Sequence, residues 1–152
     1  MKYELLVDSR PNEVIIALSK DKKLIELHKE PIGTKFSVGD IFLAKVKKII
    51  TGLNATFVDV GYERDGFLHY LDLGVKFKTF QKFTQRNLAG KLNTASLKNF
   101  KLEEEIDKSG SITDVLQSGN QILVQVAKEP ISTKGPRLTT EITIAGRYMV
   151  LV

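Results

Sequence analysis

Short apolar runs separated by turn-forming residues dominate the first part of the chain, and they predict a mainly β protein. The first three runs are Tyr3–Val7, Val14–Leu18 and Leu24–Leu27. Their length, their branched side chains and the polar residues between them are typical of an antiparallel meander. A connector around Gly33 follows, so residues 1–36 are expected to form a separate β segment.

The next block predicts the strands of a small barrel. A long apolar run, Ile41–Ile50, is turned at Thr51–Gly52, and Asn54–Val60 returns beside it. A second turn over residues 60–66 leads to a third strand, Phe67–His69. Three strands joined by two turns over about 30 residues are typical of the opening meander of a small barrel.

The following segment predicts one or two short helices. An apolar residue recurs at every third position, which indicates a helical turn with one apolar side; these residues are Phe77, Phe80 and Phe83. Further on, Ser111 is a candidate helix N-cap, and Asp114 three residues later completes a variant of the capping box. Gly119 is the expected stop of that helix.

The last part of the chain returns to strands. Asn120–Ala127 alternates polar and apolar residues, which predicts a half-buried strand with Gln125 on its polar side. Lys128–Arg137 is an expected loop, and Leu138–Ile144 an expected strand. Gly146–Val152 begins another apolar segment without a cap or a breaker, so we expect the chain to be part of a longer protein.

Composition narrows the possible functions. The 152 residues include no cysteine, which excludes a disulfide framework, a cysteine-based zinc site and a thiol nucleophile. A reducing, cytoplasmic location is consistent with this composition. The N-terminus has no signal-peptide pattern, and no apolar stretch approaches the ~18 residues of a membrane-spanning helix, so no membrane association is expected. No phosphate-binding glycine loop occurs. The acidic residues near Asp59 suit strand and turn positions, so neither a metal site nor a catalytic residue is predicted.

Positive charge is concentrated in one stretch. The net charge is +5, yet residues 74–101 contain seven basic residues and no acidic one: Lys76, Lys78, Lys82, Arg86, Lys91, Lys98 and Lys101. An acidic run, Glu103–Glu105 with Asp107, follows directly. Two interpretations stay open. The stretch could be a phosphate-binding patch anchored by the three phenylalanines, or a solvated loop balanced by the acidic run.

Aromatic and basic residues on the predicted barrel are the candidate binding site. Phe57 and Phe67 lie on neighbouring antiparallel strands, where they could lie side by side and stack with unpaired bases. The alternative is that both rings belong to the core, where phenylalanine is usually found. Basic residues that could contact phosphates are Lys45, Lys47, Lys48, Lys134 and Arg137. For the last two, the alternative is a solvated loop.

Two long segments resemble the S1-type RNA-binding domain of the ribonuclease E/G family. The run Asn54–Leu68 looks like the family signature A-x-F-V-D-x-G-x-E-R-x-G-F-L. The run Val124–Leu151 looks like its V-Q-x-x-K-E, K-G, L-T-T and G-x-Y-L-V-L segments. The resemblance covers nearly the whole chain and is weakest over residues 74–108.

The family consists of endoribonucleases that cut single-stranded RNA with a preference for a 5′-monophosphate, in RNA decay and ribosomal RNA processing. The resemblance implies a five-stranded S1-type OB barrel over residues 37–140, with a basic insert at 74–108. It implies that residues 1–36 are part of a subdomain similar to ribonuclease H, and that residues 141–152 begin a 5′-sensor region.

The resemblance also implies site residues. Phe57, Phe67 and Lys134 match RNA-contacting positions, and Gly146 and Val150 match positions that line the 5′-monophosphate pocket. The family's catalytic magnesium is held by an aspartate pair in a later subdomain, which has no counterpart here. We therefore expect this chain to bind RNA without cutting it, and to need no cofactor itself.

Two other functions remain as alternatives. One is a stand-alone OB/S1 nucleic-acid-binding module. The other is a protein–protein docking scaffold, which predicts that Phe57 and Phe67 are buried. Because an exposed three-stranded edge invites association, residues 1–36 are expected to pack on the barrel or on a second copy of the chain, as in a homo-oligomer.

Overall fold

The computed structural model describes residues 1–32, 36–92, 96–146 and 148–151. The chain divides into two compact units, residues 1–35 and 36–152. Gly33 of the expected connector and Asn93 and Thr94 of the expected basic insert lie outside the described residues, as do Arg147 of the second matched run and Val152. No helix in the described ranges has the length and apolar character that crossing a membrane requires.

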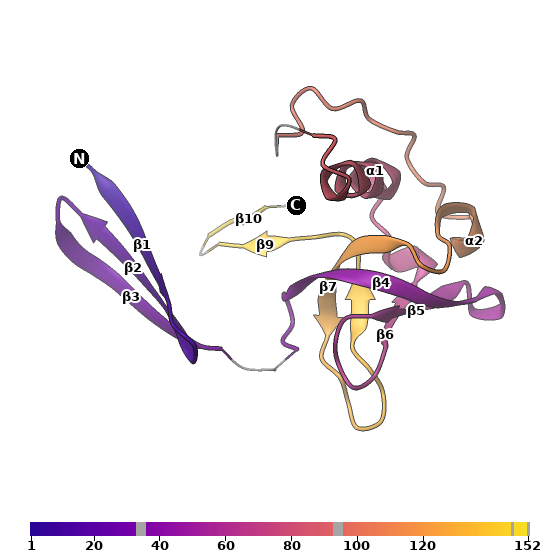
Figure 1. Cartoon of the computed structure of the whole chain (residues 1–152), viewed down its shortest axis with the longest axis horizontal. Coiled ribbons are helices and arrows are strands. Elements are labelled where there is room, and N and C mark those ends of the chain that lie inside the picture. The colour runs from indigo at the N-terminus through magenta and orange to yellow at the C-terminus, as the bar shows by residue number, and fades with distance from the viewer. Residues whose placement is uncertain (33–35, 93–95, 147, 152) are drawn as a thin grey trace. The chain divides into compact units, whose positions relative to one another are not determined.

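The first unit is an antiparallel three-stranded sheet, as predicted. Its strands are β1 (Tyr3–Ser9), β2 (Glu13–Lys20) and β3 (Lys23–Pro31), in the order β1-β2-β3 (Figure 1). Each strand extends beyond the apolar run that predicted it. In the described part of this unit only Ser19 is buried, and most of the apolar side chains of β1 and β3 are exposed.

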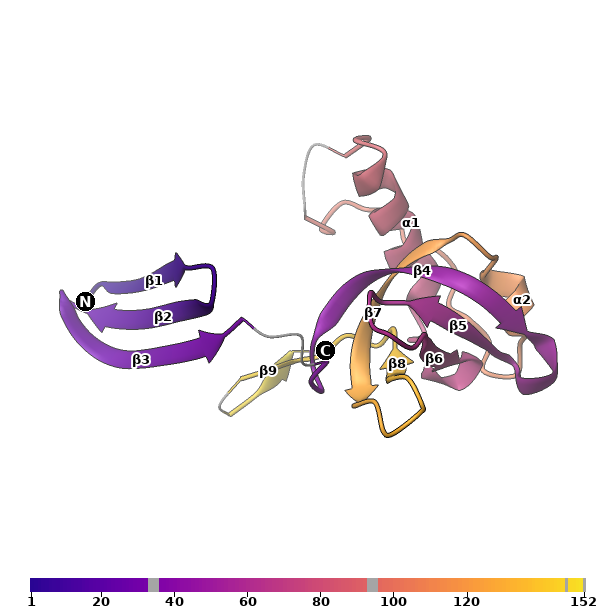
Figure 2. The same cartoon turned by 60° about the horizontal axis from the view of Figure 1, so that its bottom comes forward.

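The second unit contains a closed five-stranded barrel with OB topology. Its strands are β4 (Ile41–Ile50), β5 (Ala55–Asp59), β6 (Gly66–His69), β7 (Gln121–Lys128) and β8 (Arg137–Thr139). They follow the order β4-β5-β6-β8-β7, and β4 also pairs with β7, which closes the barrel (Figure 2). The pairing of β6 with β8 is parallel and all others are antiparallel. The predicted mainly β class and five-stranded barrel are confirmed.

Alternation along the strands fills the barrel. Thr56 and Val58 of β5 and Leu68 of β6 point inward and are buried, and Val124 of β7 and Leu138 of β8 join them. Asn54 fixes the turn before β5, a short 3-10 helix over Thr51–Leu53. Its φ of 48° is left-handed, and its side chain donates to the carbonyl of Gly110 and accepts from the N–H of Ile112.

Helix α1 (Phe77–Leu88) forms where the phenylalanine spacing predicted a helical turn, and it packs against β7. The three rings do not all anchor it to the barrel, however. Phe77 is buried in the core, Phe80 is 45% exposed, and Phe83 packs on Phe100 with ring centroids 5.3 Å apart. Only the first of the three phenylalanines therefore acts as a core anchor.

Helix α2 (Ile112–Val115) confirms the predicted N-terminus but not the predicted end. Ser111 caps it, and the capping box with Asp114 is present. The helix ends at Val115, and Leu116 is already extended. Gly119, with a φ of 89°, instead serves the turn into β7, where its N–H donates to the carbonyl of Val46.

Two further predictions about the C-terminal strands need correction. The expected strand over residues 138–144 is two strands: β8 ends at Thr139, and β9 (Ile144–Ala145) forms a hairpin with β10 (Val150–Leu151). Gln125 is buried rather than on a polar face. Its amide donates to the carbonyls of Gly39 and Thr143 and accepts from the N–H of Thr143. This buried side chain therefore fixes the segment in which the chain leaves β8.

Candidate nucleic-acid interface

Phe57 and Phe67 form an aromatic pair on the outer surface of the barrel. They are direct cross-strand partners on β5 and β6, and their ring centroids lie 6.0 Å apart at an interplanar angle of 68°. Each is only half-buried, whereas their neighbours Val58 and Leu68 fill the core. The interpretation of both rings as core residues is therefore wrong, and so is the burial that the docking-scaffold alternative predicted.

The aromatic pair lies in a row that crosses four strands. Lys48 of β4 is paired with Phe57, and Arg137 of β8 is paired with Phe67. The register of β4 against β5 shifts between Val46 and Lys48, so Lys47 is the extra residue. This shift places the exposed Lys48 directly opposite Phe57. Among the described residues no carboxylate lies within ion-pair distance of Lys48, so its charge is available to a ligand.

Lys47, by contrast, is committed to two carboxylates. Its ammonium lies 2.7 Å from Asp65 and 3.3 Å from Asp59. These two hydrogen bonds, that of Asp65 first, raise the pKa of Lys47. The N–H of Gly61, which donates to Asp59 at 3.0 Å, and then Lys47 lower the pKa of Asp59. Lys45 of β4 lies opposite Asp59 of β5. It is exposed and makes no ion pair among the described residues.

Neutralising Lys47 should shift the titration of Asp59. We expect Lys47→Gln to raise the pKa of Asp59, yet to leave it below the ordinary value because the Gly61 hydrogen bond remains. A carboxylate with a lowered folded-state pKa stabilises the fold above its unfolded pKa, about 4, and that stability is lost as the pH falls through the folded value. Carboxyl NMR titration measures the shift, and an unchanged pKa of Asp59 would contradict the pairing.

Arg137 is also less available than the sequence suggested. Its guanidinium makes a two-pronged pair with Asp72, with Nε and one Nη each 3.1 Å from a carboxylate oxygen. Such a fork geometry is the strongest arrangement of this ion pair. Arg137 therefore lies at the end of the aromatic row, but Asp72 neutralises most of its charge.

Lys134 lies in the loop between β7 and β8. This loop is tightened by reciprocal backbone hydrogen bonds between Ile131 and Lys134, at 3.2 and 3.0 Å. The next residue, Gly135, lies against the backbone of Asp65, and Phe67 N–H donates to the carbonyl of Pro136 at 2.8 Å. The loop is thus held beside the turn that precedes Phe67. Lys134 is exposed and has no ion pair among the described residues.

The two positions matched to a 5′-phosphate pocket lie together on the β9–β10 hairpin. The N–H of Gly146 donates to the carbonyl of Met149 at 2.7 Å, and Val150 is paired with Ala145. Val150 is exposed. The geometry brings these two residues together, and their role at a phosphate stays a prediction.

Two residues of the interface were missed or undervalued at the sequence level. Lys48 is predicted from the sequence as a phosphate contact, but its place opposite Phe57 depends on the register shift. His69 follows Phe67 by two residues on the same outer face, and its Nδ1 accepts from the N–H of Leu71 at 3.1 Å. Strand alternation around Phe67 could have pointed to His69. No group of three or more metal-ligating side chains occurs among the residues that the structure describes.

No protein-family model matches the chain. The chain is 35% identical over 149 residues to ribonuclease G of Haemophilus influenzae and 32% identical over 152 residues to ribonuclease G of Escherichia coli K12. These matches cover 98% and 100% of the chain. It is also 38% identical over 117 residues, 76% of its length, to ribonuclease E of a Nostoc species.

The chain spans about a quarter of the length of the two ribonucleases G, 26% and 27%, and 13% of the Nostoc ribonuclease E. The similarity nevertheless runs through both units of the chain. On this evidence, the chain belongs to the ribonuclease E/G family.

Proposed function

We propose that this chain binds single-stranded RNA on the outer face of β5 and β6. The observation that carries the proposal is the outward-facing pair Phe57–Phe67 on an OB barrel. In OB folds the face of the second and third strands, with the loops after the first and fourth strands, binds oligonucleotides. Here these are the strands β5 and β6, and the loops that follow β4 and β7.

The row through the aromatic pair suits an unpaired strand. Two half-buried rings offer faces to bases that are not stacked in a duplex, and such stacking tolerates any base. Lys48 at one end of the row and Lys134 in the adjoining loop are the cations best placed for phosphates. Lys45 can add a third contact, while Lys47 and Arg137 are held by acidic partners.

The role within a longer protein is a finer proposal. The barrel would hold RNA for a catalytic part elsewhere in an endoribonuclease that acts in RNA decay and ribosomal RNA processing. Among the described residues no group of three or more side chains could hold the magnesium of that reaction, so the ion would be held elsewhere in the longer protein and this chain would contribute RNA binding. Gly146 and Val150 would contribute to recognition of a 5′-monophosphate.

The first test is binding of a labelled single-stranded RNA of about ten nucleotides, within the range of one OB fold. Fluorescence anisotropy at several salt concentrations should show binding that weakens as salt rises. An RNA duplex should bind more weakly because its bases are already paired. A 5′-monophosphate should bind more tightly than a 5′-hydroxyl. No binding at low salt, or equal affinity for the duplex, would contradict the proposal.

Lys48→Gln tests the phosphate contact. Loss of one phosphate contact to a single strand should reduce the magnitude of the salt slope by about 0.7. The matched control is Lys23→Gln, which removes one exposed charge from β3 and should leave the slope unchanged. Equal slopes for Lys48→Gln and the wild type would show that Lys48 makes no phosphate contact.

A further inference from the structure

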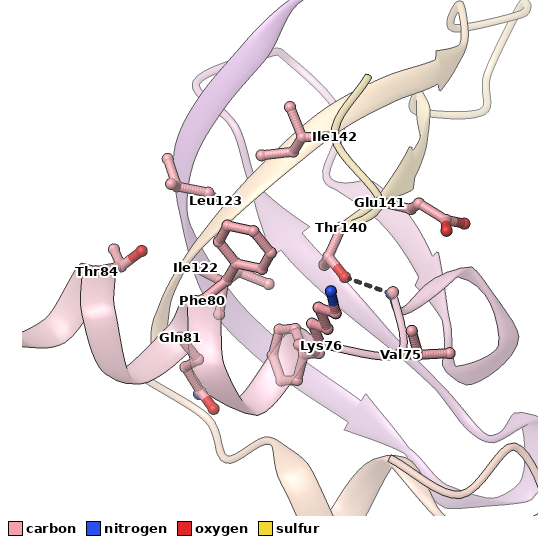
Figure 3. A pocket seen from close by; sticks show the side chains of 12 residues that line it. Val75, Lys76, Phe80, Gln81, Thr84, Ile122, Leu123, Thr140, Glu141 and Ile142 are labelled. Carbon is pink, nitrogen blue, oxygen red and sulfur yellow. Dashed lines mark hydrogen bonds between the residues drawn. The ribbon is translucent and has the colours of Figure 1, made fainter. Parts of the chain in front are cut away.

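A pocket of about 280 Å³ opens between α1, β7 and residues 140–142, a part of the barrel unit outside the β5–β6 face (Figure 3). Its floor is formed by Phe77, Thr84 and Ile122, all buried. The walls are the Phe80 ring together with Leu123 and Ile142. Its volume lies just below the usual range for ligand sites, which begins at about 300 Å³, and this suits one flat group better than an extended ligand.

Phe80 is the unusual member of this pocket. The side chain is 45% exposed although the residues before and after it on the same helix face, Phe77 and Thr84, are buried. An exposed ring at the wall of a pocket offers a stacking surface. The helix that carries Phe80 packs against β7, next to the apolar walls of the pocket.

The rim of the pocket carries hydrogen-bonding and charged groups. Lys76 is the N-cap of α1, Gln81 lies within α1, and Glu141 comes from the segment after β8. The amide nitrogen of Gln81 already donates to Asn120 at 3.4 Å, which leaves its carbonyl oxygen as an acceptor. Thr140 accepts from the N–H of Gly74 at 3.0 Å, and its own hydroxyl hydrogen has no acceptor among the described residues. An apolar slot with amide, hydroxyl and carboxylate groups at its edge matches a nucleobase, which has two flat faces and a polar rim.

The surroundings are strongly basic. Among the cations of residues 74–101, Lys82 pairs with Glu103, and Arg86 lies 5.8 Å from the Phe100 ring. Lys78 lies on the same face of α1 as Lys82 and contributes to the lowered pKa of Glu103, after Lys82 and Lys101. Lys76, by contrast, lines the pocket and has no ion pair among the described residues. The acidic run therefore balances only part of the basic stretch, and Lys76 is left as the cation at the pocket.

We propose that this pocket is a second RNA-binding site, in which one unpaired base stacks on Phe80 while Lys76 contacts a flanking phosphate. The inference rests on the proposed function, because it assigns the base to the same kind of RNA that the β5–β6 face binds. A docked apolar peptide is the competing occupant of such a pocket. The charge of Lys76 and the polar groups of the rim favour the nucleotide.

The experiment uses the full chain and two single-stranded RNAs, of about six and about 20 nucleotides, each carrying 5-iodouridine. Irradiation followed by trypsin digestion and mass spectrometry maps the cross-links. Phe80 falls in the tryptic peptide of residues 79–82, while Phe57 and Phe67 fall in other peptides. We expect the longer RNA to cross-link to residues 79–82 in addition to the β5–β6 face.

Variants give a second readout. Phe80→Leu keeps the apolar packing but removes the ring, and Lys76→Gln removes the charge at the rim. Each should weaken binding of the longer RNA about fivefold to tenfold and leave the short RNA unaffected. The matched control is Lys91→Gln, an exposed cation of the same basic stretch that does not line the pocket. Thermal unfolding verifies that all variants are folded.

The outcomes separate the two proposals. Cross-links only at the β5–β6 face, with Phe80→Leu binding the longer RNA normally, would overturn the second site and leave the proposed function standing; a peptide-docking pocket gives this result. Equal weakening by Lys91→Gln and Lys76→Gln would also overturn the second site, because it would show that RNA is attracted non-specifically by the charge of the basic stretch. Cross-links at residues 79–82 without any at the β5–β6 face would overturn the proposed function instead.

Discussion

The double variant Phe57→Ala/Phe67→Ala should lose at least about 30-fold in affinity for single-stranded RNA. Base–aromatic stacking contributes about 1–3 kcal/mol per base, so removal of two stacking rings should cost about 2–6 kcal/mol. The salt slope should change little, because no cation is removed. Fluorescence anisotropy at two salt concentrations measures both quantities.

A second double variant identifies the cause of that loss. Phe57→Leu/Phe67→Leu keeps apolar side chains on the surface and removes only the aromatic faces. If stacking binds the bases, this variant should bind nearly as weakly as the alanine variant. Wild-type affinity in the leucine variant would show that apolar contact alone is enough. The edge-to-face pair stabilises the fold by about 0.5–1.5 kcal/mol, so the binding assays are run well below the unfolding temperature.

Gly135→Ala should destabilise the barrel unit and displace the Lys134 loop. A methyl group at Gly135 would overlap the carbonyl oxygen of Asp65. Because this oxygen belongs to the backbone, no rotamer change relieves the overlap, and we expect a cost near the upper end of the range of about 1–3 kcal/mol for overpacking. Thermal unfolding measures this cost, and RNA affinity should fall with it as Lys134 moves.

Gly52→Ala is the control for that substitution. No neighbouring atom lies within 4 Å of the place that a methyl group at Gly52 would occupy, and the φ of Gly52 is not left-handed. Alanine should therefore be tolerated there with little change in unfolding temperature. A Gly135→Ala variant as stable as Gly52→Ala would mean that the loop between β7 and β8 does not touch the turn before β6.

Local sequence patterns were enough to predict the first four barrel strands to within one residue and the aromatic pair, but not the end of β8. β4 has the predicted bounds, and the signature around Phe57 and Phe67 falls on β5 and β6. The side of the sheet that each ring occupies was ambiguous, because β5 alternates Phe57 with the equally apolar Val58. Closure of the barrel resolves this ambiguity, since Val58 and Leu68 both fill its interior.

The availability of each cation could not be predicted, because it depends on residues distant in the sequence. Arg137 is neutralised by Asp72, 65 positions earlier, and Lys47 by Asp65, 18 positions later. The register shift that brings Lys48 opposite Phe57 leaves no mark in the apolar pattern of β4. The burial of Gln125 could not be predicted from the alternation, because its hydrogen-bond partners, Gly39 and Thr143, come from two other segments.

The closure of the barrel between β6 and β8 has a consequence for its dynamics. Only one residue pair, Phe67 with Arg137, joins these strands, and contacts to Asp72 complete the seam. Segments with few backbone hydrogen bonds open locally at lower free energy than the whole fold. Amide exchange at Phe67 should therefore be faster than in β5. A strand of RNA that contacts both Phe67 and Lys134 would hold this edge of the barrel closed.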